Sequence, residues 1–310
     1  MAASATTSSP FRQGAPARRR RILVIHNPEA GHGRRKRLSD VLDRLDRLGC
    51  AVVLRETRRR GDAERLAREA TAGEFDAVAV AGGDGTVNEV VNGLVTGGAG
   101  IPLAVIPLGT ANVLACEIGI DPRDAEGIAR TVALGNARTI HLGTANGRHF
   151  VVMAGAGLDA QVVEGVSEGL KRRAGRLAYL WEGMRQALGG EAPALEIRAG
   201  GQVYHGGMAV ACRGRHYGGR FVAAPDASLE DASLHICILP RGGAAGLVRY
   251  GLALPLGRLP SLPEVQMISA SSVTITGPRG GPVQGDGDIV ARLPAEIAVA
   301  RETVDLVCPE

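Results

Sequence analysis

Short aliphatic runs alternate with longer helical patterns through residues 22–134, and this alternation constrains the fold more than any other feature of the chain. The runs are Ile22–His26, Ala51–Glu56, Asp76–Val80 and Leu103–Ile106. The helical patterns lie at Arg35–Leu48, at Asp62–Ala72, after Thr86 and from Ala111 onward. Such a βαβα series predicts an α/β domain with a parallel sheet, helices on both of its faces, and function at the carboxyl ends of the strands.

The pattern changes after about residue 136 to short alternating runs separated by Gly and Pro. The runs are Arg138–Gly143, His149–Ala154, Ala194–Arg198, Gly207–Cys212, Leu234–Leu239, Ser272–Thr276 and Ile297–Val299. They predict an antiparallel, mostly β domain, interrupted by helical segments at Gly157–Ala187 and at Ala244–Leu254, before Pro255. We therefore expect a two-domain chain, with a disordered basic tail over 1–21, an α/β domain over 22–136 and a β-rich domain over 137–310.

Charge and composition exclude several classes of protein. The net charge is +4, but residues 1–21 hold five arginines and no acid, so the rest of the chain is nearly neutral. Aromatic residues make up only 3%, which argues against nucleic-acid binding by stacking. No run of about 18 apolar residues occurs, so we expect no membrane-spanning helix. The five cysteines form no C-x-x-C pair, which favours a reducing cytoplasm over a disulfide framework or a zinc ribbon.

Three glycine-rich loops follow three of the predicted strands, at His26–Gly33, Gly82–Thr86 and Pro107–Asn112. Parallel strands open at one edge of a sheet, so these loops should converge. Glycine lets a backbone N–H approach a phosphate, and the helix after each loop favours anions at its N-terminus. Each loop alone is equally an ordinary strand-to-helix turn. Three loops in register, together with the acid Asp84, favour a nucleotide-phosphate site with Mg²⁺ nearby.

The common nucleotide motifs are missing from these loops. The sequence has no G-x-x-x-x-G-K-[ST], and Lys36 stands where a dinucleotide fingerprint starting at Gly31 has Gly. A Walker-type NTPase and a standard Rossmann dehydrogenase are therefore not supported.

An ordered set of motifs points to a different class. The motifs are Asn27–Gly31, Gly82–Glu89, Pro107–Asn112, Gly155–Ala160, Lys171 with Gly175 and Tyr179, Ala224–Ser228, and Asp286–Asp288. In this order they resemble the diacylglycerol kinase catalytic-domain family, from Ile22 to about Val307. The resemblance implies a fold similar to NAD kinases and diacylglycerol kinases, with the nucleotide between the α/β domain and the β domain. It implies ATP-dependent phosphorylation of a lipid hydroxyl, diacylglycerol-like or sphingoid-like, by a cytoplasmic protein that reaches the membrane surface.

The resemblance also implies roles for individual residues. The implied ATP contacts are Asn27, Pro28, Glu29, Ala30, Gly31, Thr57, Gly82, Gly83, Asp84, Gly85, Thr86, Val87, Asn88 and Thr110. The implied structural Mg²⁺ is held by the Asp231 side chain with backbone oxygens near Ser228 and Ser233. The family prefers Asp-Gly at this place, whereas this chain has Asp231-Ala232, and Ala resists the positive φ that Gly adopts.

The segment Asp286-Gly287-Asp288 aligns with the family's D-G-E signature, which supplies the general base for the acceptor hydroxyl. With Asp in the third position the carboxylate is retracted by one methylene, on the order of 1.5 Å from a C–C bond length. A misplacement of that size can cost ~10²-fold in rate. Asp286 and Asp288 are both candidates for the catalytic base, and D-G between apolar runs is also an ordinary hairpin signal.

Two other functions stay open at this level. One is a NAD kinase-type phosphotransferase, which shares G-G-D-G. The other is a non-catalytic nucleotide or lipid sensor, in which Asp288 marks a decayed site. The arginine-rich tail and the basic residues 34–37 either contact anionic lipid, at ~1 kcal/mol for each basic residue, or are simply solvated. Acyl length, head group and oligomeric state, a homodimer included, cannot be read from the sequence.

Overall fold

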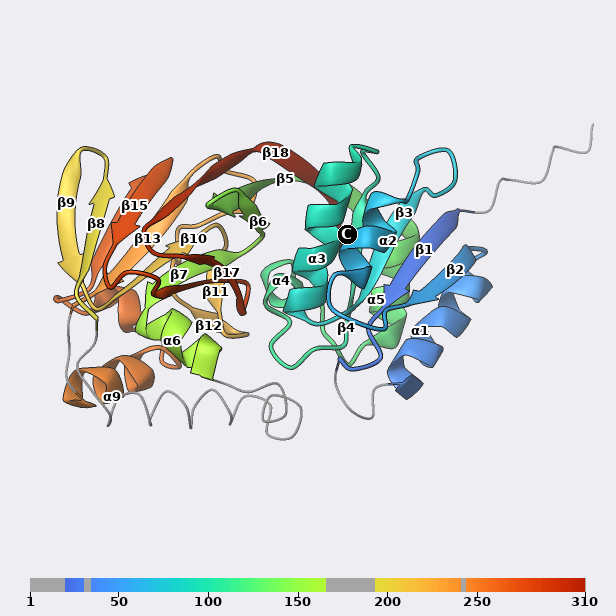
Figure 1. Cartoon of the computed structure of the whole chain (residues 1–310). Coiled ribbons are helices and arrows are strands. Elements are labelled where there is room, and N and C mark those ends of the chain that lie inside the picture. The colour runs from blue at the N-terminus through green and yellow to red at the C-terminus, as the bar shows by residue number, and fades with distance from the viewer. Residues whose placement is uncertain (1–19, 31–34, 166–192, 241–243, 310) are drawn as a thin grey trace, which may run out of the picture.

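The computed structural model describes residues 20–30, 35–165, 193–240 and 244–309, and it has two lobes (Figure 1). The N-terminal lobe contains parallel strands in the order β2-β1-β3-β4. Their bounds are β1 (Arg21–His26), β2 (Ala51–Glu56), β3 (Ala77–Gly82) and β4 (Leu103–Pro107). Every residue of β3 is buried, because this central strand is covered on both faces. The predicted α/β fold with a parallel sheet is confirmed.

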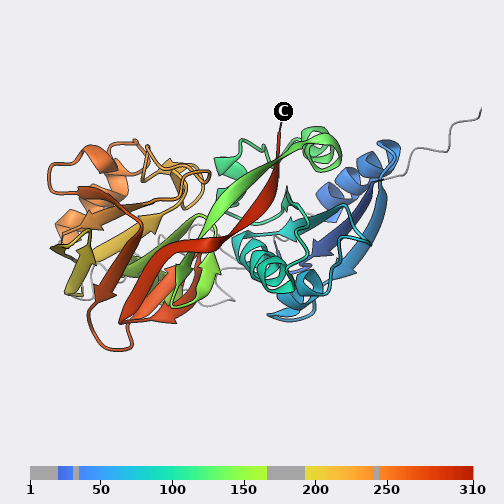
Figure 2. The same ribbon diagram turned by 90° about the horizontal axis from the view of Figure 1, so that it is seen from above.

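Helices lie on both faces of this sheet (Figure 2). The helices are α1 (Arg35–Arg47), α2 (Asp62–Arg68), α3 (Asp84–Gly97), α4 (Val113–Glu117) and α5 (Ala125–Leu134). Helix α1 packs with α5, and α2 packs with α3. The second pair is close because α3 presents glycine to α2: a Cβ added at Gly93 would lie 2.8 Å from Cβ of Ala67. This contact fixes the position of α3, whose first turn carries the G-G-D-G loop.

The second lobe is the predicted antiparallel β domain. Its strands are β5 (Asn136–Ala145), β6 (Arg148–Phe150), β7 (Met153–Gly157), β8 (Leu195–Ala199), β9 (Gln202–Gly206), β10 (Met208–Cys212), β11 (His216–Tyr217), β12 (Phe221–Val222), β13 (Leu234–Leu239), β14 (Gln266–Ala270), β15 (Ser272–Thr276), β16 (Pro282–Gly285), β17 (Asp288–Arg292) and β18 (Ala295–Cys308). Helices α6 (Leu158–Gly165) and α9 (Ala244–Ala253) and the 3₁₀ turn η1 (Leu259–Ser261) interrupt them. One sheet has the order β14-β13-β10-β7-β16-β17. Alanine, leucine, isoleucine and valine side chains form a hydrophobic core between this sheet and the sheet that contains β18, β15 and β8.

Strands β5 and β18 lie side by side and run from one lobe into the other in both views (Figures 1 and 2). Strand β18 is antiparallel to β15 at its start and parallel to β4 near its end, where Leu306 lies opposite Leu103. The sheet of the N-terminal lobe therefore continues into the second lobe. Strand β5 begins at Asn136, the last residue of the expected α/β domain, and pairs with β18 up to Ala145. Both lobes therefore share this strand.

The fold begins slightly before the expected end of the basic tail. The N–H of Arg21 donates to Asp76 (2.7 Å), and the Arg20 guanidinium donates to the carbonyl of Ala133 (2.6 Å). The rest of the expected tail, residues 1–19, lies outside the described residues, as do Gly31, Arg34, Lys171, Gly175 and Tyr179. In the part of the chain that is described, no helix has both the length and the apolar character to cross a bilayer.

Candidate active site

The three glycine-rich loops converge, as the strand order predicts. The amide of Asn27, in the first loop, donates to the hydroxyl of Thr86 in the second loop (3.1 Å). The backbone N–H groups of Leu108 and Gly109, in the third loop, donate to the carbonyl of Gly82 (2.9 and 3.1 Å). The N–H of Thr57 donates to the carbonyl of His26 (2.8 Å), so this expected contact also lies at the same edge.

Glycine is required where the second and third loops touch. A Cβ added at Gly109 would lie 2.5 Å from Cα of Gly83, and one added at Gly83 would lie 3.2 Å from Cα of Gly109. A side chain at either position would push the two loops apart. The backbones of two candidate phosphate loops are thereby held against each other at the N-terminus of α3.

The remaining predicted contacts of the first two loops are mostly backbone. After Asn27, the N–H of Glu29 donates to the Asn27 side chain (3.0 Å) and the N–H of Ala30 to its carbonyl (3.1 Å), which forms a turn around Pro28. Val87 is buried in the hydrophobic core of the N-terminal lobe. Thr110 is exposed at the edge of the third loop.

Asp84, the acid of G-G-D-G, joins the second loop to the third. Its carboxylate accepts a hydrogen bond from the N–H of Val113 (2.6 Å). Burial, opposed by this hydrogen bond and assisted by the negative charge of Asp286, raises the pKa of Asp84 to about 6. Asp84 and Asp286 come from opposite ends of the sequence, and their charges interact in one site.

This shift predicts that Asp84→Asn is more stable than the wild type at pH 7.5. A carboxyl whose folded pKa is raised costs stability when ionised, and the cost disappears as the pH falls below its ordinary pKa near 4. Asn keeps the acceptor for Val113 N–H and removes the charge. We expect a gain of roughly 1–2 kcal/mol in the free energy of unfolding, allowing for partial exposure, together with lower activity. Urea unfolding at pH 7.5 and pH 4 tests this, since an equal gain at both pH values would contradict it.

Asp286 lies at the hairpin turn between β16 and β17, and both oxygens of its buried carboxylate accept hydrogen bonds. One oxygen accepts from the N–H of Val151 (2.7 Å) and the amide of Asn88 (3.0 Å). The other accepts from the N–H groups of Val152 (2.9 Å) and Met153 (3.2 Å). Burial raises the pKa of Asp286, and these four donors act against that rise. Asp286 therefore ties the turn to α3 and to the segment before β7.

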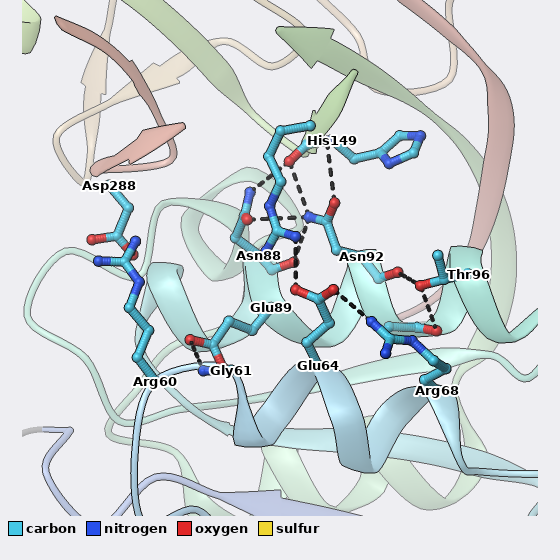
Figure 3. Close-up of polar contacts among 12 residues, drawn as sticks. Arg60, Gly61, Glu64, Arg68, Asn88, Glu89, Asn92, Thr96, His149 and Asp288 are labelled. Carbon is cyan, nitrogen blue, oxygen red and sulfur yellow. Dashed lines mark hydrogen bonds and ion pairs between the residues drawn. The ribbon is translucent and has the colours of Figure 1, made fainter. Parts of the chain in front are cut away.

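Asp288 faces the nucleotide loops from the other side of the same turn. A Cβ added at Gly85 would lie 2.5 Å from its carboxylate oxygen, so the carboxylate lies directly over the first turn of α3. Its side chain is 33% exposed, and the Arg60 guanidinium lies 3.8 Å away (Figure 3). Of the two predicted acids, Asp288 is the more accessible to a bound substrate.

A second set of side chains holds the turn between the two acids. The N–H of Gly287 donates to the side-chain oxygen of Gln284 (2.9 Å), and the Gln284 amide donates to Asp159 of α6 (2.7 Å). The hydroxyl of Tyr217 donates to the other oxygen of Asp159. Sequence reasoning did not single out any of these three side chains, although Asp159 belongs to the Gly155–Ala160 motif.

The two lobes are also bonded through α3, as Figure 3 shows. The amides of Asn88 and Asn92 both donate to the carbonyl of His149 in β6 (2.9 and 3.1 Å). The N–H of His149 donates back to Asn92 (3.2 Å), and Arg148 pairs with Glu64 of α2 (2.7 Å). These bonds hold the loops of one lobe in register with the acids of the other.

The loop at 228–233, where the resemblance implies a structural Mg²⁺, contacts the side chain of Arg213 instead. The backbone oxygens of Asp231 and Ser233 accept hydrogen bonds from the guanidinium of Arg213. The Asp231 side chain is exposed, and within the described residues no group of three His, Cys, Asp or Glu side chains could hold a metal ion. A metal ion at Ser233 would compete with the Arg213 guanidinium for the same oxygen, which does not fit the predicted metal role of Ser228, Asp231 and Ser233.

A pocket of about 430 Å³ lies away from the convergent loops. It is lined by residues such as Glu117, Arg138 and Arg215, and by the turn at 227–230. None of the loop residues and neither acid of the β16–β17 turn contributes to it. This pocket is therefore separate from the convergent loops and from the β16–β17 turn.

Comparison with known proteins agrees with this geometry. The Diacylglycerol kinase catalytic domain model matches residues 21–145, and the YegS C-terminal NAD kinase beta sandwich-like domain model matches residues 152–308. The chain is 32% identical to the diacylglycerol kinase of Bacillus subtilis (strain 168) over 294 residues, covering 94% of this chain and 97% of that protein. It is 29% identical to the diacylglycerol kinase of Staphylococcus aureus (strain MRSA252), covering 94% and 93%.

Solved structures share the whole two-lobed fold. A chain from Bacillus anthracis str. Sterne is 25% identical and superimposes with a TM-score of 0.78 over 96% of this chain and 98% of that one. A second structure, of a diacylglycerol kinase from the same organism, is 24% identical with a TM-score of 0.74 over 93% and 96%, which shows the fold. With both lobes matched and a relative 32% identical over nearly its full length, the chain belongs to the diacylglycerol kinase catalytic domain family.

Proposed function

We propose that this protein transfers the γ-phosphoryl group of ATP to the hydroxyl of diacylglycerol. The family is one of kinases, which use ATP, and the curated relatives are named diacylglycerol kinase, which favours this acceptor over a sphingoid base. One observation carries the proposal: the Asp288 carboxylate lies over Gly85, at the start of α3 and opposite the converging loops. The N-terminus of a helix favours phosphate, so a phosphate bound at the start of α3 would lie beside the Asp288 carboxylate.

The nucleotide would lie along the three loops. The first N–H groups of a helix have no acceptor within the helix, and the dipole of the 14-residue α3 favours an anion at that end. The touching backbones of Gly83 and Gly109 leave no Cβ in the way of a phosphate. Asn27, Thr57 and Thr110 are the proposed polar contacts at the rim.

Mg²⁺ would arrive with the ATP phosphates, and Asp84 is the side chain that would hold it. Carboxylate and phosphate oxygens are the ligands that Mg²⁺ prefers. The pKa of Asp84, raised to about 6 by burial and by Asp286, fits a place where a cation would offset negative charge. When bound, the ion neutralises charge on the transferred phosphoryl group.

The proposed base is Asp288, and Asp286 is a positioning residue. The Asp288 carboxylate takes the proton of the diacylglycerol hydroxyl while that oxygen forms its bond to the γ-phosphorus. The bond from the γ-phosphorus to the bridging oxygen breaks, and ADP leaves with that electron pair. Asp286 is proposed to hold the turn through its four hydrogen bonds, so that Asp288 stays over Gly85.

The substrate lies in a membrane, so the protein is proposed to act as a cytoplasmic enzyme at the membrane surface. Arg35, Lys36 and Arg37, at the start of α1, are candidate contacts for anionic lipid along with the basic tail.

Incubation with γ-labelled ATP, Mg²⁺ and a set of acceptors tests the function. We expect label on diacylglycerol in mixed micelles, with little on sphingosine or NAD. Label only on NAD would favour the NAD kinase alternative. ATP binding without transfer to any acceptor would favour the sensor alternative, and either result would contradict the proposal.

A further inference from the structure

Arg213 directly follows β10, and its side chain is completely buried in the second lobe. Arginine is rarely buried in full unless its charge and its donors are satisfied. No carboxylate lies within ion-pair distance of it among the described residues, although Asp231 is close enough to favour its charged form. Backbone oxygens must therefore satisfy the guanidinium.

Four carbonyl groups do so. The Nη1 atom donates to Ser233, and Nη2 donates to Asp231 and to Leu229 (3.0 Å). The Nε atom donates to His141 (3.2 Å). Three of these carbonyls come from the turn before β13 and one from β5, so their oxygens converge on one buried positive charge.

Converging carbonyl oxygens are also how a protein binds a hard cation. Mg²⁺ requires near-octahedral oxygen ligands at 2.0–2.1 Å, whereas a guanidinium offers a planar fork of five N–H donors. A guanidinium also keeps its positive charge at neutral pH.

The backbone of the loop agrees with this occupant. Ala232 is not among the residues with positive φ, so the left-handed conformation that a glycine would allow after Asp231 is not used. The backbone oxygen of Ser233, which the family resemblance assigns to a metal ion, is instead an acceptor of Arg213, and so is the neighbouring backbone oxygen of Asp231.

We propose that Arg213 supplies the positive charge that holds this carbonyl cluster together, so that the fold needs no metal ion there. The cluster is connected to the active site through the backbone of one residue, Val152. The N–H of Arg213 donates to the carbonyl of Val152 (2.7 Å), and the N–H of Val152 donates to Asp286 (2.9 Å). The internal cation thus supports the segment that holds the Asp286 carboxylate.

The test uses the full chain without nucleotide, so that Mg²⁺ required by ATP does not enter. We expect no stoichiometric Mg²⁺ in the purified protein by elemental analysis. We also expect the melting temperature to be the same in EDTA and in a large excess of MgCl₂. One Mg²⁺ per chain, or a melting temperature that falls in EDTA, would overturn the proposal whatever the kinase assay shows.

Variants separate charge from shape. Arg213→Met keeps most of the volume but leaves the carbonyls without a donor, and we expect a melting temperature lower by on the order of 10 °C. Arg213→Lys keeps the charge and should recover part of this loss. The matched control is Arg215→Met, because Arg215 is about half exposed beside Glu117 and should matter little. If Arg213→Met and Arg213→Lys lower the melting temperature equally, the charge has no role and the proposal is contradicted. If neither variant folds, the wild-type metal measurements decide.

Discussion

Asp288→Asn should lower kcat for lipid phosphorylation by about 10²–10⁴-fold, the range for loss of a general base. Asn keeps the size of the side chain but cannot take the proton of the acceptor hydroxyl. The KM for ATP should change little, because the loops supply most of the proposed nucleotide contacts. The melting temperature should also be nearly unchanged, since the Arg60 guanidinium that Asp288 pairs with is largely exposed. Steady-state kinetics and thermal unfolding of the same preparation measure both.

Asp288→Glu is the matched control. It restores the carboxylate that the family signature has at this position, with one more methylene. We expect it to keep more activity than Asp288→Asn, because a shift of about 1.5 Å, which can change the rate by up to ~10²-fold, still leaves a carboxylate that can take the proton. An Asp288→Asn protein with wild-type turnover would exclude Asp288 as the base.

Asp286→Gly should lower the free energy of unfolding by about 3 kcal/mol or more. Four N–H donors, from Asn88 and from residues 151–153, lose their acceptor, and an unpaired buried donor costs about 1–3 kcal/mol. Asp286 has φ of 51°, which glycine adopts without strain, so this substitution isolates the loss of the carboxylate. Urea unfolding measures the change.

Asp286→Asn separates the two roles of the turn. Asn tolerates positive φ and keeps one acceptor oxygen, so a positioning role predicts a folded protein that retains more turnover than Asp288→Asn. If Asp286→Asn has the wild-type melting temperature and yet loses as much kcat as Asp288→Asn, then Asp286 is the base and our assignment is wrong.

Much of the fold followed from local pattern. The alternation of short runs such as Asp76–Val80 with helical patterns predicted the parallel sheet, and β3 is buried throughout, as a central strand covered on both faces should be. The convergence of the loops followed from parallel strand order alone. The sequence could not indicate that β18 returns to pair with β4, because a strand's partner depends on chain topology rather than on its own residues.

The loops of the site could be predicted from the sequence, but the residues that hold the two acids in place could not. Asp286 and Asp288 carry the same chemistry in the sequence, and only tertiary contacts distinguish them: four N–H donors surround one, and the other lies over Gly85. Gln284 and His149 lie in ordinary strand patterns with no signal of their role. The sequence around Arg213 gives no signal of burial, because the carbonyl groups that accept its hydrogen bonds come from two distant segments.

We expect the loops to hold ATP with its γ-phosphate facing Asp288. A crystal structure with Mg²⁺ and a non-hydrolysable ATP analogue tests it most directly. We predict phosphate oxygens about 3 Å from the backbone N–H groups at 83–85, with the terminal phosphate beside the Asp288 carboxylate. A nucleotide bound instead in the pocket beside Glu117, Arg138 and Arg215 would contradict the account.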